Sequence, residues 1–189
     1  MKKIVIRFNA PVILTFALLS LLALLLGNWT DGAATYQYFS VYRSSLSDPL
    51  TYVRFFGHVL GHADYEHYMS NMLLILLVGP GLEEKYGSGT MVWTIAVTAL
   101  VTGLVHFVFF PGSVLLGASG VVFMMIVLSS FTAMRRGEIP ITLILVVIFY
   151  LGGEIMDGLF KQDSISQITH IVGGLCGLVF GFTIRRGRR

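Results

Sequence analysis

The sequence has little charge, a single cysteine and no polar stretch long enough to form a sizeable soluble domain. Asp, Glu, Lys and Arg make up 12% of its 189 residues, whereas a soluble domain carries about 25%. Hydrophobic residues make up 55% of the chain and form long runs. These properties exclude an ordinary soluble protein and predict one that crosses a membrane several times. The lone Cys176 lies in an apolar run, so it supports no disulfide within the chain.

Six apolar segments approach the length of roughly 20 residues that a transmembrane helix needs. They cover residues 11–26, 65–79, 90–110, 119–134, 139–156 and 165–184. They predict an all-α bundle of six transmembrane helices that forms one domain over residues 1–189, since no internal repeat or interdomain linker is evident. The first segment follows basic residues as a signal peptide does, but no clean cleavage site comes after it, so we expect it to be retained.

The segment between the first two predicted helices, residues 27–64, is polar and rich in aromatic residues. Tryptophan and tyrosine favour the membrane–water interface. We therefore expect a long external loop that lies on the outer leaflet or dips into it.

The net charge of +3 does not indicate nucleic-acid binding, because the basic residues gather at the ends of the apolar segments. If the segments alternate across the membrane, ten basic residues share one side: Lys2, Lys3, Arg7, Lys85, Arg135, Arg136, Arg185, Arg186, Arg188 and Arg189. The other side holds three: Arg43, Arg54 and Lys161. Cytoplasmic loops carry an excess of Lys and Arg. Both termini are therefore expected in the cytoplasm, in a multi-pass protein of the plasma or inner membrane.

A cluster of small residues, Gly117-Ala118-Ser119-Gly120, opens the fourth apolar segment. It places one hydroxyl beside the first N–H groups of a helix, which have no partner inside the helix and suit an anion. Residues 112–118 carry no charge, so the helix can begin below the outer surface of the membrane. Serine-containing turns are common in membrane proteins, and this motif alone is a weak indication of a catalytic serine.

Three histidines and an amide lie near the start of the second predicted helix. His67 and Asn71 are four residues apart on one helical face, and both side chains can donate hydrogen bonds. His58 and His62 have the same spacing and could bind a metal together with His67. No cysteine or carboxylate has an evident ligand spacing beside them, so we expect a structural role for His58 and His62 and no bound metal or cofactor.

His170 shares one helical face with Gly173, Gly177 and Gly181 in the sixth predicted helix. Glycines at four-residue spacing let two membrane helices approach closely. The face that carries His170 is thus predicted to contact a neighbouring helix. Packing explains the glycines, but it does not explain a titratable ring on the same face.

These residue types are the parts that acyl transfer requires. Serine needs a base to take its proton, and His170 can supply one. The N–H of Ser119, the ring of His67 and the amide of Asn71 can stabilise an oxyanion. Because no acidic residue occupies an obvious third position, we predict a Ser119/His170 dyad. The charged cluster that begins at Glu83 is interpreted from the sequence alone as a solvated loop.

The ordered set of motifs from Arg54 to Gly181 resembles the rhomboid family of intramembrane serine proteases. The resemblance implies Ser119 as nucleophile and His170 as base. It implies that His67, Asn71 and Gly117 stabilise the oxyanion. It also implies a six-helix core with a water-filled, outward-facing cavity. The expected substrates are transmembrane segments of proteins in the lipid bilayer, cut near small residues where the helix unwinds.

The same resemblance implies supporting roles for several residues: Arg54, His58, His62, Glu83, Phe123, Gly173, Gly177 and Gly181. In the family, the glutamate that matches Glu83 is usually structural. Two positions depart from the usual pattern. Phe123 replaces a tyrosine that stacks on the catalytic ring, and Val53 replaces a tryptophan in the long loop.

Two other functions remain open from the sequence. The first is a catalytically inactive rhomboid-like chaperone or binding protein, although such relatives typically lose the serine or the histidine. The second is a small transporter or metal channel, which would need charged groups along a continuous path. The glycines at 152 and 153, after Leu151, make the fifth predicted helix a candidate gate for substrate entry, and the aromatic loop is the alternative.

Overall fold

A computed structural model describes residues 8–132, 138–151 and 164–184. In these ranges the regular structure is helical, and the one extended pairing joins Val41 to Leu115. The helices are α1 (Pro11–Trp29), α2 (Ala33–Tyr38), α3 (Pro49–Gly57), the 3₁₀ turn η1 (His58–Leu60), α4 (Tyr65–Tyr86), α5 (Ser88–Phe109), α6 (Ser119–Ser129), α7 (Ile141–Val146), the π-helical segment η2 (Val147–Leu151) and α9 (Ser164–Thr183). The all-α prediction is confirmed for these ranges.

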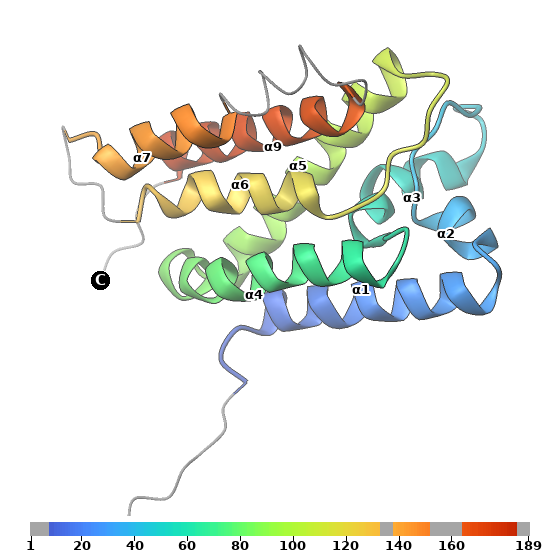
Figure 1. Cartoon of the computed structure of the whole chain (residues 1–189), viewed down its shortest axis with the longest axis horizontal. Coiled ribbons are helices and arrows are strands. Elements are labelled where there is room, and N and C mark those ends of the chain that lie inside the picture. Colours follow the sequence, from blue (N-terminus) through green and yellow to red (C-terminus); the bar gives the residue numbers. More distant parts are fainter. Residues whose placement is uncertain (1–7, 133–137, 152–163, 185–189) are drawn as a thin grey trace, which may run out of the picture.

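Helices α4, α5 and α9 pack against α6, and α1 packs on α4 and α5. Figure 1 shows α1, α4, α6 and α9 roughly parallel or antiparallel, with α5 crossing them obliquely. The successive helices α1, α4, α5 and α6 run in alternating directions, and α9 runs in the same direction as α6. Helix α6 is apolar on all sides, and eight of its eleven residues are buried. A helix that is hydrophobic all round belongs in a core. Its most extensive partner is α9.

The outside of the bundle is apolar as well. Large aliphatic side chains of α1 and α4 are more than half exposed, among them Leu18, Leu25 and Leu77. Two helices, α1 and α5, are long and apolar enough to cross a bilayer, and α6 and residues 167–183 form shorter apolar helices. Exposed aliphatic side chains beside long apolar helices are typical of a surface that faces lipid. The prediction of a membrane protein is thereby supported.

The ends of several helices differ from the ends that the apolar segments of the sequence predict. Helix α4 does not stop near Gly79 but continues through Pro80 to Tyr86. Gly79, just before the proline, packs so closely on Ile13 of α1 that a Cβ there would lie 2.7 Å from the Ile13 side chain. Helix α6 ends at Ser129. The candidate gate glycines at 152 and 153 lie outside the described residues, as do the terminal basic residues.

The long segment between α1 and α4 is folded around Arg54. This side chain is 4% exposed, donates from Nε to the Gln37 carbonyl over 2.9 Å, and forms a 3.1 Å ion pair with Asp48. Its guanidinium also lies 4.6 Å from the centre of the Tyr42 ring. Burial raises the pKa of Tyr42, and the nearby Arg54 charge opposes that rise. Arg54 therefore anchors the segment, while Val53 beside it is exposed.

Candidate active site

The start of α6 is held in place by the preceding residues 111–118. Leu115 exchanges two 2.8 Å backbone hydrogen bonds with Val41, and the Gly117 N–H donates to the His58 carbonyl over 2.9 Å. Ser119 is the first residue of α6 and is half-buried, and the N-cap Ala118 provides no side-chain cap. The first N–H groups of α6 therefore lack an acceptor within the helix.

The His170 ring lies flat against the ring of Phe123. Their centres are 4.3 Å apart and their planes differ by 8°. Phe123 is one turn after Ser119, and a helical side chain covers the turn that precedes its own Cα. The stack therefore brings the His170 imidazole to the turn of α6 that begins with Ser119.

The glycines of α9 allow this approach. A Cβ at Gly173 would collide with the Gly120 carbonyl oxygen and would lie 2.8 Å from its carbon. A Cβ at Gly177 would come 3.0 Å from Val127, and one at Gly181 would strike the Phe131 ring. The prediction that the His170 face packs closely on a neighbouring helix is confirmed, and the neighbour is α6.

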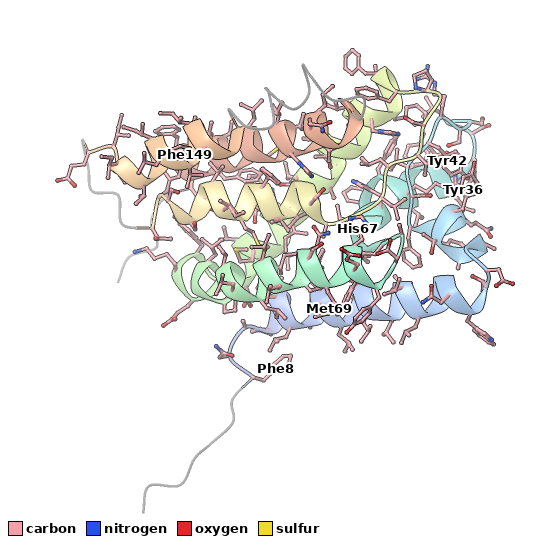
Figure 2. All side chains as sticks on the ribbon, in the orientation of Figure 1. Phe8, Tyr36, Tyr42, His67, Met69 and Phe149 are labelled. Carbon is pink, nitrogen blue, oxygen red and sulfur yellow. The ribbon has the colours of Figure 1, made fainter. Side chains whose placement is uncertain are left out.

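His67 reaches the same place from α4 and lies between the starts of α4 and α6 (Figure 2). A Cβ at Gly117 would be 2.8 Å from both Cε1 and Nε2 of the His67 ring, and Gly117 has a φ of 122° that favours glycine. Because the Gly117 N–H is already donated to His58, this residue is not a free oxyanion donor. Its contribution is the space that the His67 ring occupies.

Asn71 is 6% exposed and lies one turn after His67 on α4. One N–H of its amide donates to the His67 carbonyl over 2.8 Å. An amide has two N–H groups, so the second N–H can serve another acceptor. Asn71 therefore fixes the turn that carries His67 and has a second amide N–H that can be donated elsewhere.

His58 and His62 pack around the site instead of converging with His67 on one point. The His58 ring pairs with the Arg54 carbonyl at 3.2 Å and the Thr102 hydroxyl at 3.3 Å. The His62 ring donates from Nδ1 to the Leu60 carbonyl over 3.2 Å and meets the His67 ring edge to face at 5.0 Å. Burial is the main cause that lowers the pKa of His62 to about 4. In the described ranges, no three His, Cys, Asp or Glu side chains are grouped to hold a metal.

Two further residues position the site and were not singled out from the sequence. The Asp64 carboxylate accepts from the His67 backbone N–H over 2.7 Å and caps α4. His106, which is 2% exposed, donates from Nε2 to the Ser113 carbonyl over 3.2 Å and holds the segment before α6. An aspartate directly before an apolar helix is a recognisable N-cap signal. No comparable signal marks His106.

The interpretation of the Glu83 cluster as a solvated loop is wrong for Glu83 itself. This side chain is 4% exposed. Its two carboxylate oxygens accept from the N–H groups of Val12 and Ile13 over 3.1 Å each, and one also accepts from the Ser88 hydroxyl over 2.7 Å. Glu83 therefore ties the start of α1 to α4 and α5, at the end of the bundle away from Ser119.

Comparison with known proteins assigns the chain to a family. The family model of the Rhomboid domain matches residues 49–187. Over 144 residues the chain is 31% identical to Rhomboid-related protein 1 of Caenorhabditis elegans, covering 69% of this chain and 39% of that protein. Over 164 residues it is 28% identical to Rhomboid-related protein 2 of Mus musculus, covering 74% and 53% respectively. The matches thus span about two fifths to one half of these relatives. The family match extends over most of this chain, which is therefore a membrane protein of the rhomboid family.

Proposed function

We propose that this protein is an intramembrane serine endopeptidase. Its substrates are transmembrane proteins, and it hydrolyses peptide bonds in or near their membrane-spanning segments. Ser119 is the nucleophile and His170 the general base. The Ser119 N–H, the His67 ring and the Asn71 amide stabilise the oxyanion, and no metal or cofactor takes part.

The stack of His170 on Phe123 carries this proposal. The stack fixes the plane of the imidazole at 4.3 Å from a residue one turn after Ser119. A base for a serine nucleophile must lie within reach of the hydroxyl and keep one orientation. Ring stacking and the close α6–α9 contact supply that orientation without a carboxylate, which fits a dyad.

The reaction follows from this arrangement. The Ser119 Oγ attacks the scissile carbonyl carbon while His170 takes the hydroxyl proton, and the carbonyl oxygen becomes an oxyanion. The tetrahedral intermediate collapses as His170 returns the proton to the leaving amine, which leaves an acyl ester on Ser119. A water molecule then attacks the ester, again with His170 as base, and releases the carboxylic acid product.

The membrane placement is part of the proposal. One domain over residues 1–189 crosses the plasma or inner membrane six times, with both termini in the cytoplasm. Residues 27–64 form the external loop, and Ser119 faces a cavity that opens to the outer side. The alternating directions of α1, α4, α5 and α6, the parallel run of α9 with α6 and the distribution of basic residues support this placement.

Cleavage of a reporter transmembrane substrate by the purified protein in liposomes tests the function. The wild-type protein should cleave, and Ser119→Ala and His170→Ala should each abolish cleavage. Ser129→Ala is a matched control, because this serine lies at the other end of α6 and donates to the Ile126 carbonyl over 2.7 Å. Cleavage by either dyad variant, or loss of cleavage in the control alone, would refute the assignment.

A further inference from the structure

An apolar groove of about 520 Å³ runs between α1 and α5 and ends beneath α3 and η1. Its walls are two helical stripes with four-residue spacing. On α1 they include Thr15 and Leu19, and on α5 they include Val92 and Ala96. None of the residues assigned to the reaction lines it. The groove is therefore a separate feature on the outside of the bundle.

The groove has the depth of one leaflet of a bilayer. Along α5 it extends from Ser88 to Ala99, about 17 Å at the rise of an α-helix. The hydrocarbon core of a bilayer is about 30 Å thick. Phe56 and Val59 line the groove where α3 and η1 cover its far end. A transmembrane helix needs the whole thickness, so the groove is too short for one and suits a lipid chain of a single leaflet.

We propose that one acyl chain of an anionic phospholipid occupies this groove, in the leaflet where α1 and α5 begin. This inference rests on the membrane placement proposed above and not on proteolysis. The groove begins at Pro11 and Ser88, the first residues of α1 and α5, and Lys85 of α4 lies three residues before Ser88. Basic groups next to the membrane attract anionic headgroups. Two carboxylates lie next to Lys85 in the sequence. Glu83 is buried, where it caps the start of α1, and Glu84 is exposed.

The bound acyl chain supports the segment that positions the start of α6. Val59 lines the groove and is 4% exposed. The backbone carbonyl of its neighbour His58 accepts a 2.9 Å hydrogen bond from the N–H of Gly117. Gly117 lies two residues before Ser119. A filled groove therefore holds η1 against the bundle, and through His58 it steadies the segment that leads into Ser119.

Native mass spectrometry of the full chain tests the site with palmitoyl-oleoyl-phosphatidylglycerol as the probe. The wild-type protein, released from vesicles of this lipid into mild detergent, should retain one lipid molecule. Ala96→Phe and Thr15→Phe fill the groove from its two walls, and each should lose that molecule. Leu104→Phe is the matched control, since Leu104 is 40% exposed on α5 but does not line the groove, and it should retain the lipid.

Circular dichroism of each variant ensures that a loss of lipid is not a loss of fold, and the two filling variants serve as independent tests. Equal retention by all four proteins, or no retained lipid in the wild-type protein, would overturn the site. A protein dimer that both filling variants disrupt would show that a second copy is the occupant and would overturn it as well. Equal retention of palmitoyl-oleoyl-phosphatidylcholine would overturn the preference for an anionic headgroup. None of these outcomes depends on whether Ser119 is catalytic.

Discussion

Glu83 offers a test of the fold that is independent of the proposed chemistry. Its carboxylate accepts the N–H groups of Val12 and Ile13 at the start of α1 and the hydroxyl of Ser88 at the start of α5. In Glu83→Gln the side chain keeps its length but has one acceptor oxygen in place of two. One of the two backbone N–H groups then faces an amide NH₂ and loses its partner.

The expected cost follows from that lost partner. Leaving a buried donor unsatisfied costs about 1–3 kcal/mol, and hydrogen bonds to a charged group contribute at the upper end of the usual range. We therefore expect Glu83→Gln to lower the free energy of unfolding by about 1–3 kcal/mol. For a protein of this size, each kcal/mol lowers Tm by about 2–4 °C. Glu83→Ala removes both acceptors and should cost more.

Thermal unfolding in detergent micelles, followed by circular dichroism, measures this effect. Glu84→Gln is the matched control, because Glu84 is the adjacent carboxylate and is exposed. A surface substitution of this kind changes stability by about 0.5 kcal/mol or less. Equal Tm values for Glu83→Gln and Glu84→Gln would refute the cap that ties α1 to α4 and α5.

Three further predictions concern the site and its surroundings. Gly173→Ala places a Cβ against a backbone carbonyl of α6. It should lower stability by about 1–3 kcal/mol and abolish cleavage in liposomes. Gly81→Ala has open space on α4 and should lower neither stability nor cleavage. Asn71→Ala should lower kcat/KM, and the increase in activation free energy calculated from that change should be at most about 2.7–4 kcal/mol. Burial lowers the pKa of His58 and His62 to about 4, so the unfolded chain binds more protons below its histidine pKa of about 6.5. Stability in denaturant titrations should therefore fall from pH 6.5 toward 4, and less so in His62→Gln.

The sequence was most informative where the relevant pattern is local. Four-residue spacing places His67 with Asn71, and three-residue spacing places His170 with Gly173, on single helical faces, and the structure has them there. The glycine face of α9 packs on α6 as expected. Helical periodicity encodes both relationships, because it depends only on residues within a few turns of one another.

Contacts between distant segments could not be predicted in the same way. The charged neighbours of Glu83 in the sequence indicate a solvated side chain, yet its partners are residues at the start of α1, about seventy positions away. Arg54 is another example, since its ion pair and its cation–π contact need the fold of the whole segment between α1 and α4.

The role of Gly117 also required the structure. The sequence pattern predicts that it stabilises the oxyanion, but in the structure its N–H is donated to the His58 carbonyl and its missing side chain makes room for His67. Phe123 is a similar case. The ring that replaces the usual tyrosine keeps the stack on His170, which the residue type alone left open.

Covalent labelling with a fluorophosphonate tests the central claim most directly, because the probe reacts with an activated serine and not with an ordinary hydroxyl. Peptide mass spectrometry of the labelled wild-type protein should find the phosphonate on Ser119. The label should disappear in His170→Ala, which keeps the serine but lacks the base, and persist in Ser129→Ala. Absence of label on the folded wild-type protein, or equal labelling of His170→Ala, would contradict a Ser119/His170 dyad.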